Sequence, residues 1–223
     1  MDKIPVEKII RTRRRTISLE VTRDATLVVR APVRASSAYI EEMIQEKRAW
    51  ILRKMEEMRN RPKPPVREYA EGDLFFFMGR SYPLHIEEND RAGIQRLDKL
   101  VVSRSLLPDI REGIRRWYMN EAEKEIRGRC MWFSMTTGIV PSSVRISDAR
   151  QRWGSCTHTG KLSFSWRLIQ APPEIIDYVV VHELAHIPHP DHSKKFWNRV
   201  GQIMPDYERR REWLRENERL LRI

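Results

Sequence analysis

Cysteine is scarce in this chain, and long apolar stretches are missing from it. The 223 residues include only Cys130 and Cys156, which are too few for a disulfide framework and do not form a CxxC pair. We interpret both as small buried thiols. No apolar run approaches the roughly 18 residues of a membrane-spanning helix, and the charged N-terminus lacks the apolar core of a secretory leader. These absences predict a soluble, cytoplasmic protein without redox chemistry or membrane contact.

Positive charge is in excess, since 42 Lys and Arg residues face 31 Asp and Glu residues, and the formal net charge is +11. The densest basic cluster, at the start of a predicted strand, consists of Arg11, Arg13, Arg14 and Arg15. Such guanidinium groups can contact DNA phosphates without sequence preference. They can equally form a solvated face that only aids solubility. The sequence leaves both interpretations open.

The N-terminal half has the pattern of a β-rich module. Alternating apolar residues predict a β-hairpin over 17–29, and a helix is expected from Ser36 or Ser37 to just before residue 61. Three prolines within 61–65 predict a linker, because they remove amide donors and force extended backbone. Beyond it, short apolar runs over 74–102 predict a small antiparallel set of strands. We therefore predict a first domain over residues 1–105 with one long helix.

The C-terminal half combines helices with a second hairpin. Helical spacing predicts a long helix over 109–131 that closes near Gly138. Strict alternation over 161–168, after a turn at 157–160, predicts a hairpin with one apolar face. A helix is expected to start at 171–174, where proline costs nothing, although its β-branched residues favour a strand by propensity. These elements form a second predicted domain, 106–223, in a protein of the α+β class.

Residues 182–186 read His-Glu-Leu-Ala-His, which is the pattern HExxH. On a helix, positions i and i+4 lie on one face, so His182 and His186 can bind a single zinc ion. Glu183 can then reach a metal-activated water as general base. Four of the six histidines also fall within residues 182–192, a crowding that random placement rarely produces.

A catalytic zinc site needs a third protein ligand and an open position for water. We predict His192 for this ligand, because Pro188 and Pro190 should end the metal helix near Ile187 and turn the chain back. His189 is closer in sequence, but it lies within the proline-bracketed turn.

The segment Arg152-Trp153-Gly154-Ser155-Cys156 admits two interpretations. In one, it is a strand beside the metal helix that pairs with an extended substrate, and Arg152 or Ser155 stabilises the oxyanion. In the other, Trp153 and Cys156 belong to the core and Arg152 packs against a carboxylate. Further aromatic residues fall at strand or helix spacing and are predicted to be core rather than stacking surfaces for a ligand. These are Trp166, Phe196, Trp197 and Trp213.

Several segments together resemble the YgjP-like family of predicted zinc metallopeptidases. They are residues 14–19, 79–82, 151–156, 164–169 and 178–186, His192-Ser193 with Phe196-Trp197, and residues 204–207. The resemblance implies a zincin-like (gluzincin-like) minimal protease domain, a β-hairpin plus the HExxH helix, related to SprT and Wss-type proteases that act on proteins attached to DNA. It also implies that His182, His186 and His192 are metal ligands and that Glu183 is the catalytic glutamate.

The sequence therefore predicts a zinc-dependent metallopeptidase that hydrolyses protein or peptide substrates, with possible non-specific DNA contact through its basic surface. One alternative keeps the Zn²⁺ site but hydrolyses a non-peptide amide or ester. The other is a basic nucleic-acid-binding module in which the zinc is structural.

Overall fold

The computed structural model describes residues 4–22, 24–60, 68–88 and 93–221. The chain divides into two compact units, Met1–Lys63 and Pro64–Ile223. The predicted linker over 61–65 and Arg23 of the first predicted turn lie outside the described residues. The predicted domain boundary after residue 105 falls inside the second unit. Within the described ranges, no helix has the length and apolarity needed to cross a membrane.

The first unit contains a three-stranded sheet in the order β1-β3-β2. Its strands are β1 (Val6–Thr12), β2 (Ser18–Val21) and β3 (Leu27–Pro32). The antiparallel pair β2–β3 confirms the predicted hairpin, whereas β1, which pairs with β3 in parallel, was not predicted. Our placement of the basic cluster at a strand start was therefore incomplete, because Arg11 belongs to β1 and Arg13 to Arg15 follow that strand.

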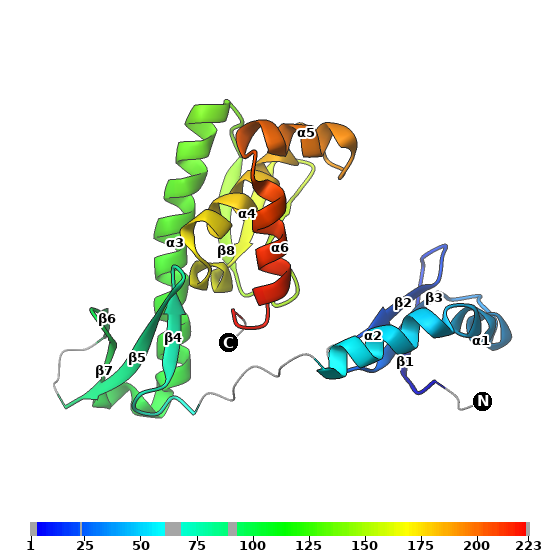
Figure 1. Ribbon diagram of the computed structural model, residues 1–223, viewed down its shortest axis with the longest axis horizontal. Coiled ribbons are helices and arrows are strands. Elements are labelled where there is room, and N and C mark those ends of the chain that lie inside the picture. The colour runs from blue at the N-terminus through cyan, green and yellow to red at the C-terminus, as the bar shows by residue number, and fades with distance from the viewer. Residues whose placement is uncertain (1–3, 23, 61–67, 89–92, 222–223) are drawn as a thin grey trace. The chain divides into compact units, whose positions relative to one another are not determined.

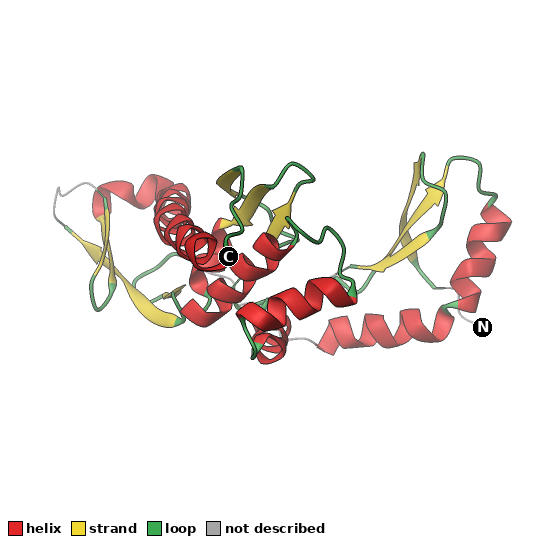
Figure 2. Ribbon diagram, turned by 90° about the horizontal axis from the view of Figure 1, so that it is seen from above, coloured by secondary structure: helices red, strands yellow, loops and turns green. Residues whose placement is uncertain are grey.

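Two helices, not one, cover this sheet. They are α1 (Ser37–Glu46), capped by the hydroxyl of Ser36, and α2 (Arg48–Asn60). The predicted single helix is interrupted at Lys47, whose N–H bonds to the carbonyls of Met43 and Gln45. Both helices lie on one face of the sheet (Figure 2), where their apolar residues share one buried cluster with β3.

The second unit begins with a four-stranded sheet in the order β4-β5-β7-β6. Its strands are β4 (Leu74–Phe77), β5 (Arg80–Glu87), β6 (Ile94–Arg96) and β7 (Leu100–Ser103). The prediction of a purely antiparallel set was wrong, because β5 and β7 are parallel. β6 pairs with β7 in the antiparallel sense, on the side of β7 opposite to β5.

This sheet is fastened to the C-terminal part of the chain. The N–H groups of Met78 and Gly79 donate to the carbonyls of Ile169 and Gln170, at 2.8 and 3.1 Å. Gly79 has φ +77°, and a Cβ there would lie 3.0 Å from Pro172, so the tight turn needs glycine. The sheet also shares one buried core with the elements that follow it in the chain.

The remaining elements of the second unit include a buried helix, α4. They are the 3₁₀ segment η1 (Arg104–Asp109), α3 (Ile110–Thr137), β8 (Ser143–Ser147), β9 (Gly154–Cys156), β10 (Lys161–Ser165), the 3₁₀ segment η2 (Trp166–Gln170), α4 (Pro173–Ala185), α5 (Lys194–Ile203) and α6 (Tyr207–Asn217). As predicted, β9 and β10 form a hairpin and α3 closes at Gly138, in the left-handed conformation.

The predicted alternation over 161–168 fails at its end. The strand stops at Ser165, and the chain continues as η2. Arg167 was assigned to the polar face, but it is buried, and its guanidinium pairs with the carboxylate of Asp148 at 2.6 Å. The same carboxylate accepts a hydrogen bond from the indole N–H of Trp166 at 2.7 Å. A buried arginine is tolerated here because its charge is paired.

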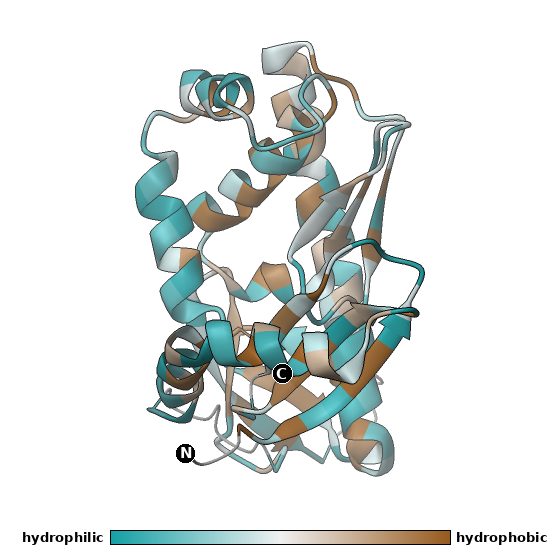
Figure 3. Ribbon diagram, turned by 90° about the vertical axis from the view of Figure 1, so that its right-hand side faces the viewer, coloured by the Kyte–Doolittle hydropathy of each residue, from teal (hydrophilic) through white to brown (hydrophobic). Residues whose placement is uncertain are grey.

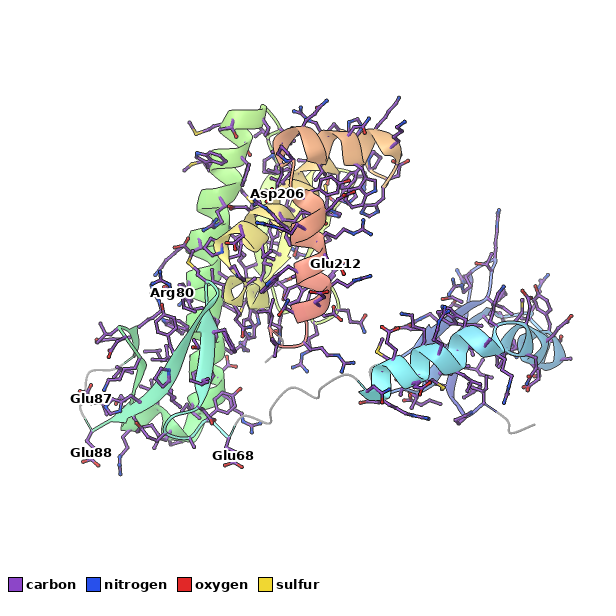
Figure 4. The ribbon with its side chains drawn as sticks, viewed as in Figure 1. Glu68, Arg80, Glu87, Glu88, Asp206 and Glu212 are labelled. Carbon is purple, nitrogen blue, oxygen red and sulfur yellow. The ribbon has the colours of Figure 1, made fainter. Side chains whose placement is uncertain are left out.

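Prolines flank helix α4 on both sides, as expected. Pro172 and Pro173 begin it, and it ends at Ala185, three residues before Pro188. It packs against α3, α5 and α6 (Figure 1). It is the most apolar helix of the described chain, whereas α6 is largely hydrophilic (Figure 3). Burial on nearly every side explains why a β-branched run forms a helix here, since packing outweighs propensity.

Candidate metal centre

Three histidines meet at the C-terminal end of α4. His182 and His186 project from one face of this helix and its cap, and His192 comes from the loop before α5. The ligand atoms of the three side chains all lie within 4.8 Å of one another. The Nε2 atoms of His182 and His192 are 3.1 Å apart. The chain reversal therefore brings together the three histidines that the sequence singles out.

His189 is not part of this cluster, but its backbone contributes to it. Nδ1 of His186 lies 3.2 Å from the carbonyl oxygen of His189, so a proton on Nδ1 is donated to that oxygen. The opposite nitrogen of the ring, Nε2, is then left with its lone pair. The turn thus orients the His186 imidazole.

Two aromatic side chains of α5 form the wall behind the imidazoles. The ring of Phe196 stacks on His186 with centroids 4.5 Å apart and meets His182 and His192 edge-on, both at 4.9 Å. Trp197 stacks on His192 at 5.7 Å. Phe196 is fully buried and Trp197 is half-buried. Phe196 belongs to the core, as predicted, whereas Trp197 is only partly buried and packs against the core. Both rings restrict the rotamers of the histidines.

The electrostatics favour neutral imidazoles at His182 and His186. Burial is the main cause that lowers the pKa of His182 to about 3, and the charges of His186, His192 and Arg211 lower it further. Burial also lowers the pKa of His186. Neutral imidazole is the form that binds a metal, because the ligand nitrogen must carry a lone pair.

The donor set fits a zinc ion. In a tetrahedral site with zinc–nitrogen bonds of about 2.0–2.1 Å, two donor nitrogens lie about 3.3 Å apart. The 3.1 Å between the Nε2 atoms of His182 and His192 is close to this value. Three histidines also leave one tetrahedral position open.

Glu183 is buried beside the cluster with an unsatisfied carboxylate. Its Oε2 atom is buried and has no hydrogen-bond partner within the described part of the chain. Burial raises the pKa of Glu183 to about 8, and the positive charge of Arg152 acts in the opposite direction. A carboxyl group with a pKa near neutrality can take up and release a proton at physiological pH, as general acid–base chemistry requires.

The two oxyanion candidates are placed differently. Side chains alternate between the faces of a strand, and the side of β9 on which a Cβ of Gly154 would lie faces Glu183. Ser155 is the next residue, so its side chain lies on the opposite face, away from Glu183. Arg152 is exposed, and its charge acts on the Glu183 carboxyl group. The structure therefore brings Arg152, but not Ser155, toward the candidate base.

Sequence reasoning missed two contributors to the centre. One is the His189 carbonyl, which no side-chain pattern reveals. The other is Gly154, where an added Cβ would lie 2.5 Å from both Cγ and Oε1 of Glu183. A glycine inside a strand is a recognisable signal of close approach, but it does not name the group that approaches.

A comparison with known families identifies the family of this chain. The model of the YgjP-like metallopeptidase domain matches residues 15–217. The chain belongs to the YgjP-like family. Within it, the protein is a metal-dependent peptidase, and its substrates are proteins or peptides.

Solved structures and curated proteins add little to this identification. The YgjP-like chain is similar to the crystal structure of the metallopeptidase zymogen abylysin of Pyrococcus abyssi, with 24% sequence identity and a TM-score of 0.38. The match covers 44% of this chain and 96% of that one. No curated protein matched the chain.

Proposed function

We propose that this protein is a zinc-dependent peptidase in which His182, His186 and His192 hold the ion and Glu183 is the general base. The second unit is then a zincin-like metallopeptidase domain, to which the first unit is appended. The observation that carries the proposal is the convergence of three imidazoles within 4.8 Å beside a buried carboxylate. The lowered pKa of His182, which favours a ligand nitrogen with a lone pair, and the 3.1 Å nitrogen separation support zinc as the ion.

Each residue of the centre has a distinct task in peptide hydrolysis. Bound zinc supplies a Lewis acid that acidifies water and polarises a carbonyl group. Glu183 removes the proton of the attacking water and delivers it to the nitrogen of the leaving amine. Arg152, whose charge acts on the Glu183 carboxyl group, is our candidate to stabilise the developing oxyanion. Phe196 excludes water from the back of the site.

The outer edge of β9 supports an extended substrate. β9 is at the end of the strand order β8-β10-β9. Its bonds to β10 involve Trp153, which accepts from Ser165 at 2.8 Å, and Thr157, which donates to Lys161 at 3.0 Å. Because pairing alternates in an antiparallel ladder, the backbone groups of Gly154 and Cys156 point to the open edge. We propose that a peptide strand pairs with them beside Glu183.

Removal and return of the metal test this function. Chelation should abolish cleavage of an unfolded protein substrate, and one equivalent of Zn²⁺ per chain should restore it, whereas Mg²⁺ should not, because it prefers oxygen ligands. Stoichiometric zinc without cleavage of protein substrates would contradict the proposal. Cleavage of only small esters or non-peptide amides would favour the alternative hydrolase, and zinc loss that unfolds the chain would favour a structural ion.

We also propose a non-specific DNA contact through the first unit, based on the basic cluster and on the implied relationship to SprT-type proteases. Arg11 serves the fold, because its guanidinium donates to the carbonyls of Val33 and Ala35, at 3.1 and 2.6 Å. Arg13 and Arg15 are exposed, and Arg14 is half-buried. We expect weak DNA binding whose affinity falls steeply as salt rises.

Replacing Arg13, Arg14 and Arg15 with Gln should reduce the slope of log affinity against log salt by roughly 2–3, since each lost phosphate contact removes about 0.9. The matched control replaces three exposed arginines of the second unit with Gln, namely Arg104, Arg116 and Arg209. Its slope should stay steeper than that of the variant with the changed cluster. Fluorescence anisotropy with a random duplex measures both. Equal slopes in the two variants would reduce the cluster to a solvated face.

A further inference from the structure

A glycine of the edge strand lies directly against the candidate base. A Cβ built on Gly154 would lie 2.5 Å from Cγ and from Oε1 of Glu183, and 2.7 Å from its Cδ. Ordinary contacts between such atoms are about 3.5–4 Å. All three of the nearest atoms belong to Glu183, and none belongs to a histidine of the cluster. Glu183 therefore occupies the space in which any other residue would carry its side chain.

The backbone at this position does not require glycine. The positive-φ glycines of the described chain are Gly72, Gly79, Gly93, Gly138 and Gly160, and Gly154 is not among them. Gly154 pairs with Phe164 in a regular antiparallel register. Glycine inside a strand weakens it, because it adds conformational entropy to the unfolded chain and offers no side chain for packing. The reason for a glycine at this position is therefore the close approach of Glu183.

Hydrogen bonds do not hold both oxygens of the Glu183 carboxylate within the described residues. Its Oε2 atom has no hydrogen-bond partner among the described residues. A hydrogen bond therefore does not fix this oxygen. The close approach to β9 at Gly154 limits where the carboxylate can lie.

We infer that Gly154 is a positioning residue for the general base: its missing side chain allows the Glu183 carboxylate to lie directly against β9. The inference rests on the proposed function, because it gives Glu183 the role of base. It adds that the rate depends on the strand as well as on the metal helix. A methyl group at residue 154 would separate the carboxylate from the strand by about 1 Å, the distance that restores an ordinary contact.

The test is Gly154→Ala in the full-length, zinc-loaded chain. A displacement of about 1 Å at a catalytic group typically costs about 10²-fold in rate, so we expect kcat on a fluorogenic peptide to fall about 100-fold. KM should change less than threefold, because the backbone groups at the strand edge remain. Zinc content should stay at one per chain. The matched control is Gly128→Ala on α3, where an added Cβ meets no atom within 4 Å, and its kcat should be unchanged.

A second background separates positioning from a damaged fold. In Glu183→Ala the clashing atoms are gone, so adding Gly154→Ala should leave the residual kcat unchanged and should not lower the melting temperature. In the wild-type background, Gly154→Ala should lower the melting temperature. Full activity of Gly154→Ala, or an equal loss in both backgrounds, would overturn the inference. If Glu183→Gln itself remained active, the base assignment and thus the proposed function would fail instead.

Discussion

Glu183→Gln should retain one zinc ion per chain and lose about 10²–10⁴-fold of its peptidase activity, the usual effect of removing a positioned general base. Glutamine keeps the size of the side chain, so the contact with Gly154 and the three imidazoles are preserved. An amide cannot accept the proton of the attacking water. Metal analysis and the rate of peptide cleavage, measured on the same preparation, check both parts of this expectation.

The control for this substitution is a carboxylate in the same sequence region that is remote from the centre. Glu174→Gln changes the first turn of the same helix, where the residue is exposed, and should leave the rate within twofold. Wild-type activity in Glu183→Gln would remove the residue from the mechanism. Loss of zinc together with activity would show that Glu183 supports the ion rather than the proton transfer.

His192→Ala should lower zinc affinity by more than the 10–100-fold that is typical for losing a partner of a metal ligand, and should abolish turnover. The expected effect is large because the side chain lies in the cluster itself, with its Nε2 atom 3.1 Å from that of His182. Only two imidazoles would remain, fewer than the three protein ligands of catalytic zinc sites. Competition with a chromogenic chelator gives the affinity directly.

His189→Ala is the matched comparison. The substitution keeps the backbone carbonyl that lies 3.2 Å from Nδ1 of His186, so zinc content and activity should stay near those of the wild type. The opposite pattern, in which His189→Ala strips the metal and His192→Ala does not, would refute the assignment of the third ligand. His182, His186 and Glu183 could then still act together with a different third metal ligand.

The metal helix was the most predictable part of the chain. The i, i+4 spacing of His182 and His186 places both side chains on one face of a helix, and the flanking prolines indicate where that helix begins and ends. Pro173 opens α4, and the helix stops at Ala185, before Pro188. The histidine spacing and the flanking prolines are local signals, whereas the β-branched run between them is helical because of its packing.

Other elements depended on contacts that no local pattern reports. The strand β1 has a half-exposed, charged sequence and exists because β3 offers a partner in parallel. Arg167 has the alternation of a surface residue and is buried because Asp148 pairs with it. The contact of Gly154 with Glu183 joins residues from two elements. Each of these features is decided by long-range pairing, which periodicity along one segment does not contain.

The bonds from Met78 and Gly79 to the carbonyls of Ile169 and Gln170 have a consequence for how the second unit folds. Each bond joins positions 91 apart in the chain (169 − 78 and 170 − 79), and contacts of such high sequence separation form slowly, because a long loop must close first. During synthesis, the turn between β4 and β5 can form these bonds only after η2, the segment before α4, has been made. These two bonds are therefore expected to be among the late contacts in the folding of the second unit.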